Sequence, residues 1–406
     1  MRLAFARMTT RGTQISSSTR IVPFAHGFRP FFLAALCYAL LGIGMWVWIR
    51  ETGVAPLQKL PPQLWHGHEM LFGFIVAAIA GFLLTAVPSW TSSLPFAGPR
   101  LAGLAALWLA GRICFGFATF LPVIVVAAIE LLFLPMLALM IAPALIRARN
   151  RNTPLLAVLG VLWLIDAIFL GAMAHGDILL AIITLRVGVD IVLLLITVIG
   201  GRIVPTFTAN ALRSRGLSPK ARDRRWVDRV TIVSMIVVVA IDAAAPEHSV
   251  AAIAAGVCAL TQAVRLAGWE GERSLQQPIV WVLHVGYLWL PIGFALKAIY
   301  LSTGAIWSSQ WLHALTIGAA STMIVAVITR ASLGHTARPL AVSRSVAIAY
   351  GLLSAATLVR VFGAPLIAHA EWAVLASGAL WFAAFALVLA QYAPILLQPR
   401  VDGRPG

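Results

Sequence analysis

Long apolar segments alternate with short polar connections along the chain. Apolar residues follow one another continuously within each segment, which predicts helices rather than membrane strands, where apolar and polar residues would alternate. Each segment is close to the length of about 20 residues with which a helix crosses a bilayer. The segments are residues 30–49, 66–88, 101–118, 121–146, 154–174, 178–199, 227–244, 249–268, 278–301, 309–329, 342–363 and 372–396. We therefore expect an all-α polytopic membrane helix bundle of about twelve transmembrane helices.

The composition agrees with this pattern and excludes a water-soluble globular protein. Of the 406 residues, 61% are hydrophobic and only 11% are charged, whereas soluble domains carry about 25% charged residues. Twelve spans leave no room for a sizeable soluble domain, so a binding site must lie inside the bundle. We divide the chain into an N-terminal tail at 1–28, a single transmembrane helical domain at 29–397 and a C-terminal tail at 398–406.

The net charge of +16 would suggest a nucleic-acid partner in a soluble protein, but here the positions of the charges indicate membrane topology. Most of the 30 lysines and arginines lie in or beside the two tails and every second connection, and the densest group is a loop near 202–226. Basic residues concentrate on the cytoplasmic side of membrane proteins, where lipid headgroups are anionic. We expect both tails and this loop to be cytoplasmic, the lipid bilayer to be a partner, and no nucleic acid to bind.

Four charged residues fall near the middle of predicted spans, where burial in hydrocarbon is costly and often has a functional reason. They are Glu130, Asp166, Arg186 and Asp190. Arg186 and Asp190 are four residues apart on one helix, so we expect them to form an ion pair. Glu130 and Asp166 are then left unmatched. Either the acids carry protons along a water-filled path, or they belong to a hydrogen-bond network that holds the helices together.

Three histidines open predicted spans at the same level of the membrane. His66 and His68 begin the second span, and His313 begins the tenth. Imidazoles at one depth could meet around a metal or a haem iron. Because residues two apart on a helix point about 200° away from each other, His66 and His68 would more naturally face different partners. Glu69 lies three residues after His66, so it could orient the His66 ring.

A second set of histidines lies toward the cytoplasmic ends of the spans, with three arginines nearby. The histidines are His26, His284 and His335, and the arginines are Arg29, Arg202 and Arg330. Arginine side chains could bind haem propionates or another anion in a bidentate manner. The alternative is structural, because basic residues at helix ends also cap helices and contact headgroups.

Six short segments together resemble the NnrS family. They are HGFRPFF, WHGHEMLFGF, GFLLTAVPSWT, GGRIVPTFT, HALTIGAASTM and TRASLGHTARPL, and they are distributed over nearly the whole chain. The resemblance implies about twelve membrane helices in the bacterial inner membrane, haem and copper as cofactors, and a role in the response to nitric oxide and nitrosative stress that accompanies denitrification. The residues at the matching positions include His26, Arg29, His66, His68, Arg202, His313, Arg330 and His335. The resemblance does not assign individual histidines to haem or to copper.

The sequence thus favours a haem- and copper-binding inner-membrane protein that binds or processes nitric oxide. A nitric oxide oxidoreductase would need an unidentified electron donor and proton carriers, for which Glu130, Asp166 and Asp190 are candidates. A protein that only senses or sequesters nitric oxide fits the sequence equally well. The alternative from another class is a secondary transporter, because two sets of six spans around a basic loop resemble the major-facilitator layout.

Overall fold

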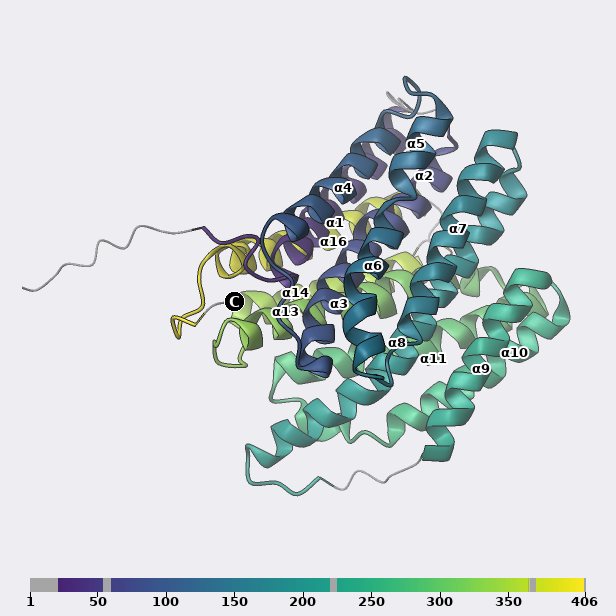
Figure 1. The fold of residues 1–406 in the computed structure, drawn as a ribbon. Helices are drawn as coiled ribbons and strands as arrows, with labels where there is room; N and C mark the ends of the chain where they lie inside the picture. Colours follow the sequence, from purple (N-terminus) through teal and green to yellow (C-terminus); the bar gives the residue numbers. More distant parts are fainter. Residues whose placement is uncertain (1–20, 54–59, 220–224, 364, 366–369, 405–406) are drawn as a thin grey trace, which may run out of the picture.

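The computed structural model describes residues 21–53, 60–219, 225–363, 365 and 370–404. The predicted tail up to residue 20 and residues 220–224 of the predicted basic loop lie outside this part of the chain. All regular structure among the described residues is helical, which confirms the predicted fold class (Figure 1).

The elements that carry the sites are α1 (Phe28–Thr52), α2 (Pro62–His68), η1 (Glu69–Ile75), α3 (Val76–Thr91), α4 (Pro99–Gly116), α5 (Val123–Glu130), α6 (Phe133–Arg147), α7 (Leu155–His175), α8 (Ile178–Arg213), α9 (Arg225–Ala244), α10 (Ser249–Ala267), α11 (Pro278–Thr303), α12 (Trp311–His313), η4 (Ala314–Ser321), α13 (Thr322–His335), α14 (Arg344–Leu358), η5 (Val359–Gly363) and α16 (Ala370–Leu397).

All twelve predicted segments are helical, although several boundaries differ. Within the described ranges, ten helical segments are long and apolar enough to cross a membrane. Helices α4 and α9 are not among these ten, but they pack in the same bundle. Helix α8 continues well beyond the predicted end at residue 199 to Arg213, so the first part of the predicted basic loop is helical. This extension still packs on the bundle, because Val204, Thr208 and Leu212 are buried.

The two ends of the described chain meet at one end of the bundle. The backbone N–H of Val22 donates to the carbonyl of Leu397 at 2.8 Å. Arg29, fully buried at the start of α1, donates to the last carbonyls of α16, including that of Leu396 at 2.8 Å. Along their length α1 and α16 pack together, and Trp381 donates to the carbonyl of Ala39. We call the end that holds residues 21–27 and 398–404 the terminal end, and the opposite end, where α2 and α12 begin, the distal end.

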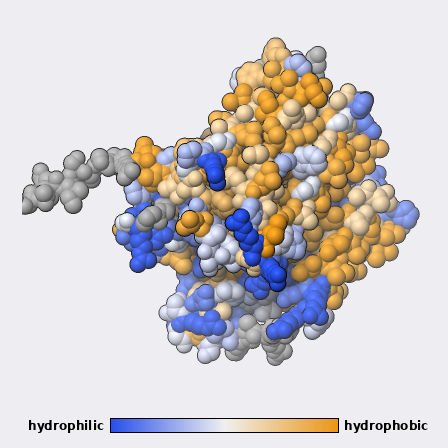
Figure 2. Space-filling model, viewed as in Figure 1, coloured by the Kyte–Doolittle hydropathy of each residue, from blue (hydrophilic) through white to orange (hydrophobic). Residues whose placement is uncertain are grey.

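The outer surface carries large apolar side chains in the manner of a lipid-facing surface. On α10, the residues Ile253, Val257 and Leu260 follow one helix face and are at least half exposed. Figure 2 shows apolar residues over most of the visible face, whereas hydrophilic residues gather toward the left and bottom of the view, near the C-terminus. Because a soluble protein rarely exposes so large an apolar surface, this distribution supports a multi-pass membrane protein.

Two wide helical turns follow directly on histidines. The π-helical segment η1 begins immediately after His68, and η4 begins immediately after His313. Glycines allow close packing within both segments, since a β-carbon on Gly73 would lie 2.3 Å from the Tyr38 ring and one on Gly318 would lie 2.5 Å from the Trp289 ring. Such π-helical turns are frequent at functional sites. The histidines at these two helix starts, His66, His68 and His313, are therefore candidate site residues.

Candidate functional site

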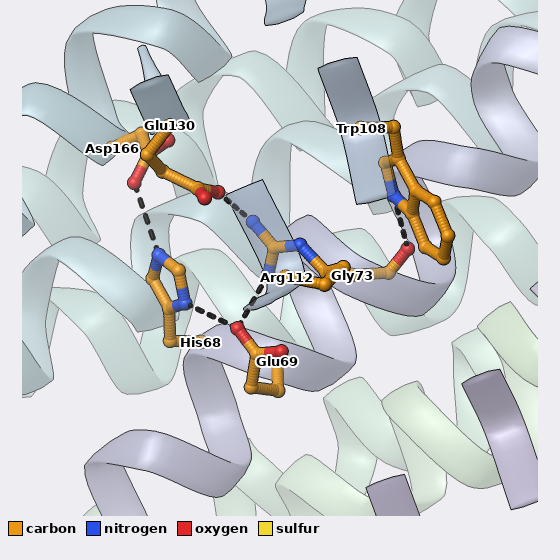
Figure 3. Close-up of polar contacts among 7 residues, drawn as sticks. All are labelled: His68, Glu69, Gly73, Trp108, Arg112, Glu130 and Asp166. Carbon is orange, nitrogen blue, oxygen red and sulfur yellow. Dashed lines mark hydrogen bonds and ion pairs between the residues drawn. The ribbon is translucent and has the colours of Figure 1, made fainter. Parts of the chain in front are cut away.

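Five buried side chains from separate helices form a continuous polar chain near the distal half of the bundle (Figure 3). The Nε2 atom of His68 lies 3.1 Å from Asp166 Oδ1, and its Nδ1 atom lies 3.0 Å from Glu69 Oε1. Arg112 donates to Glu69 through Nη1 and to Glu130 through Nη2. We call these five residues the carboxylate cluster. They join α2, η1, α4, α5 and α7, so the cluster links segments that are far apart in the sequence.

Aromatic and glycine residues shape this cluster. The His68 ring is stacked between Phe115, at 3.9 Å between ring centroids, and Phe169, at 4.8 Å. Gly111 lies against Glu130, because a β-carbon at this position would lie 2.7 Å from Glu130 Oε2. The carboxyl group of Glu130 can therefore reach Arg112 only because residue 111 has no side chain.

The carboxylate cluster contains more acidic than basic groups. Three carboxyl groups share one guanidinium and one imidazole, and Glu130 Oε2 is buried without a hydrogen-bond partner among the described residues. Ligand atoms of His68, Glu130 and Asp166 all lie within 4.8 Å of one another. Because unpaired charge is costly in a buried site, the cluster requires additional protons or a cation. Both ring nitrogens of His68 already face carboxylates, so His68 could bind a metal only by releasing one of these contacts.

Two predicted contacts of the acidic residues are wrong. Glu69 contacts His68 and not His66, because it follows His68 directly and its side chain turns to the same side as Arg112. Arg186 lies 3.8 Å from Glu247 and forms no ion pair with Asp190 within the described part of the chain. A long arginine side chain near a helix end extends toward the polar boundary, and this explains the choice of partner.

Glu130 and Asp166, predicted to be unmatched, in fact belong to an interhelical network, which is one of the two alternatives that the sequence left open. Asp166 contacts His68, and Arg112, the basic partner of Glu130, was missed by the sequence reasoning. Its signal was present, because a single arginine within an apolar span is as unusual as a buried acid. Asp190 lies elsewhere, in a group with Asp242 and Lys297.

His66 and His313 form a second candidate site at the distal end, which we call the distal histidine pair. The two imidazoles are close enough to interact electrostatically with each other and with Arg360 of η5. The His66 ring stacks on Trp46 at 4.6 Å between centroids. The Nδ1 atoms of both histidines are buried and have no hydrogen-bond partner among the described residues. Of the three histidines predicted at one level, the structure thus brings two together and places His68 on the opposite helix face.

A third candidate site lies at the terminal end. The rings of His26 and His335 are 5.5 Å apart between centroids, and Phe28 contacts both. The Nδ1 atom of His26 is buried without a partner in the described structure. Burial lowers the pKa of His26 to about 4, and the positive charges of Arg29 and Arg400 act in the same direction, as would a charge on His335. The His26 ring is therefore neutral at pH 7 and able to bind a metal.

A cavity of about 400 Å³ adjoins His335. Its walls are mainly apolar and include Phe32, Phe82 and Phe207, while Arg330 and His335 supply polar groups. The Arg330 guanidinium lies 3.8 Å from the centroid of the Phe207 ring. The cavity therefore combines a flat apolar space with one imidazole and one arginine.

The remaining predicted residues have structural contacts. Arg29 caps α16, as described above, and Arg202 donates to Asn152 Oδ1 at 2.5 Å. His284 lies 2.8 Å from Thr208 through Nε2 and packs on Gly271, whereas its Nδ1 atom is buried without a hydrogen-bond partner among the described residues. For Arg29 and Arg202, the structure thus provides contacts of the helix-capping and helix-packing type, which was the alternative to anion binding.

A protein-family model matches nearly the whole chain. The family model described as NnrS protein matches residues 22–400, a range that contains all the sites described above. No match is found among curated proteins.

Proposed function

The chain belongs to the NnrS family, and on this premise we propose that it binds haem and copper and that it binds or processes nitric oxide. Family membership supports a membrane protein of the nitric oxide response. The observation that carries the cofactor proposal is the presence of buried imidazole nitrogens without hydrogen-bond partners among the described residues, at His26, His66, His284 and His313. Buried polar atoms nearly always have a partner in folded proteins. A bound metal would satisfy these nitrogens.

The distal histidine pair suits copper. Imidazole nitrogen is a common copper ligand, and His66 and His313 each have a buried free Nδ1 atom. Neither ring contacts a carboxylate of the described residues, unlike His68. We propose that these two histidines hold the copper ion.

The terminal cavity suits haem. Its volume of about 400 Å³ and its phenylalanine walls fit a flat apolar macrocycle. His335 would bind the haem iron, as imidazole does in many haem proteins, and Arg330 would pair with a propionate. His26 lies beside His335 and is the nearest further ligand.

When bound, haem and copper would supply the affinity for nitric oxide and the change of oxidation state. The residues of the chain would hold the metals and provide protons. Reduction of nitric oxide to nitrous oxide consumes protons and electrons, and the electrons would come from a donor that is not identified. Asp166, His68 and Glu69 form an unbroken series of contacts, and Arg112 extends it to Glu130. This series is suited to storing a proton within the membrane.

We propose further that the protein lies in the bacterial inner membrane with both tails in the cytoplasm. The concentration of basic residues at the terminal end supports this orientation. Helices α4 and α9 would complete twelve crossings, since each is of adequate length and packs against helices that qualify as spans.

Absorption spectroscopy and metal analysis of the detergent-purified protein test the proposal. We expect a Soret band that shifts on reduction with dithionite and again on addition of nitric oxide, together with bound copper. His335→Ala should remove the haem band, whereas His66→Ala should remove copper and keep the band. His175→Ala, at an exposed position at the end of α7, is the matched control. A colourless and copper-free preparation would contradict the proposal and favour the transporter alternative.

A further inference from the structure

A second buried ionic group joins α8, α9 and α11. Lys297 donates to Asp242, and the ammonium group lies 4.9 Å from the centroid of the Trp311 ring. Asp190 lies within electrostatic range of both Asp242 and Lys297. All three side chains are at most 4% exposed. Trp311 belongs to the short helix that also carries His313.

The charges in this group do not balance. Lys297 compensates one carboxylate, that of Asp242. The second carboxyl group, on Asp190, has one buried oxygen without a hydrogen-bond partner among the described residues. Arg186, one turn away on α8, acts on Asp190 through its charge, but it forms no ion pair with Asp190 among the described residues and lies 3.8 Å from the exposed Glu247. Cys258 is the group that α10 presents to Asp190, and its thiol is not a cation. An unpaired carboxylate is unfavourable in such a site, so one further positive charge must be present.

A pocket connects this group to the distal end of the bundle. Its volume is about 310 Å³, which holds several water molecules, and it is lined by Asp242, Lys297, Tyr300, Arg186 and Glu247 among others. The side chain of Glu247 is 80% exposed, so the mouth of the pocket is open to solvent. Asp242 and Lys297 line the pocket directly, and Asp190, which is not part of the lining, interacts with both of them.

We propose that Asp190, Asp242 and Lys297 form a proton-exchange site that takes up one proton from water in this pocket. On uptake, a proton leaves hydronium, an O–H bond forms on a carboxylate oxygen of Asp190, and water remains in the pocket. Release follows the same route in reverse. The pair of Asp242 and Lys297 stays charged and keeps water near the Asp190 carboxyl group. This proposal concerns residues outside the haem and copper sites and does not depend on them.

Infrared difference spectroscopy of the metal-free, full-length protein tests the proposal. A protonated carboxylic acid has a carbonyl-stretch band that carboxylates lack. With two acids and one ammonium the site holds one such proton, so Asp190→Asn should remove one band. Asp242→Asn should remove the same band, because Asp190 then becomes the charged partner of Lys297. Lys297→Met should instead double the band, because both acids must then be neutral.

Access through the pocket is tested by exchange into heavy water. The band should shift rapidly in the unmodified protein and more slowly in Leu301→Trp, which fills the lining of the pocket. Asp177→Asn is the control, since Asp177 lies at the start of α8 and an asparagine can still cap the helix. Identical spectra for the unmodified protein and a folded Asp190→Asn variant would overturn the proposal. Loss of the band on adding sodium, but not choline, would also overturn it, since the site would then bind a metal cation.

If Asp190→Asn does not fold, two other measurements test the proposal. They are the spectrum of Lys297→Met and the pH dependence of the carbonyl-stretch band in the unmodified protein. A band that neither increases in Lys297→Met nor changes with pH contradicts the proposal.

Discussion

His66 and His68 are separated by a single glycine, yet their surroundings are opposite. Both ring nitrogens of His68 contact carboxyl groups, and its ring lies between two phenylalanines. The His66 ring stacks on Trp46, lies within electrostatic range of His313 and has a buried Nδ1 atom without a partner in the described structure. The helix twist places the two rings on different faces. One short motif therefore contributes to two sites. In the carboxylate cluster both nitrogens of His68 are already paired, whereas in the distal histidine pair the Nδ1 atom of His66 can bind a ligand.

The difference teaches that burial alone does not identify a metal ligand. His68 is the most buried of these histidines, but its nitrogens are already used. In the distal histidine pair, whose residues are half-buried, and in buried His26, the Nδ1 atoms are buried and no described group forms a hydrogen bond with them. The two kinds of histidine should respond differently to mutation, because the first contributes to stability and the second to cofactor binding.

The largest expected effect on stability is that of Arg112→Met. Removing the guanidinium leaves Glu69 and Glu130 buried without their shared cation, which should cost about 3–5 kcal/mol in the free energy of unfolding. Chemical denaturation in detergent measures the loss. Arg100→Met, on the exposed start of the same helix, is the control and should change little. A comparable loss in both variants would show that Glu69 and Glu130 are not stabilised by pairing with Arg112.

A smaller loss is expected for Gly111→Ala. The new methyl group would lie 2.7 Å from Glu130 Oε2, so the carboxyl group must move away from Arg112, at a cost of about 1–3 kcal/mol. Gly103→Ala on the same helix meets nothing within 4 Å and should be neutral or slightly stabilising. Equal melting temperatures for the two variants would contradict the packing of Gly111 against Glu130.

The pH dependence of the metal-free protein gives a third, smaller effect, at His26. Its folded-state pKa is lowered from 6.5 to about 4, so the unfolded chain binds a proton that the folded chain does not. The contribution of His26 to stability is therefore complete above pH 6.5 and is lost as the pH falls toward 4. His26→Gln should flatten the melting temperature measured over this range. An unchanged slope in the variant would show that His26 is not held neutral by the fold.

The smallest effect on stability should come from His66→Ala, with a cost of about 1 kcal/mol or less, since no hydrogen bond of the His66 ring to a described residue is broken. The same change should abolish copper binding. His68→Ala should show the reverse result, with reduced stability and retained copper. Metal analysis together with denaturation distinguishes the two. Loss of copper from a folded His68→Ala variant, with full retention in His66→Ala, would reverse the assignment of the two histidines.

The helices and most of the candidate site residues could be identified from the sequence, because continuous apolar segments and intramembrane polar residues are local signals. It was insufficient for the contacts. The spacing of Arg186 and Asp190 allowed an ion pair, but Glu247 from another connection is the partner of Arg186. The partners of Glu130 and Asp166 come from α4 and α2, and helix order in space cannot be read from hydrophobicity. Asp242, Lys297 and Arg360 were also missed, although each is a charged residue within a helix of the bundle.

Arg29 has a consequence for how the protein is made. One of its acceptors, the carbonyl of Leu396, lies 367 positions later in the chain. The ribosome therefore releases the first membrane helix long before the last one exists, and the buried guanidinium reaches its final hydrogen bonds only when synthesis is nearly complete. Chains that terminate prematurely, even by a dozen residues, would keep a strongly hydrated cation at the start of their first span and expose it to the cell's proteolytic surveillance.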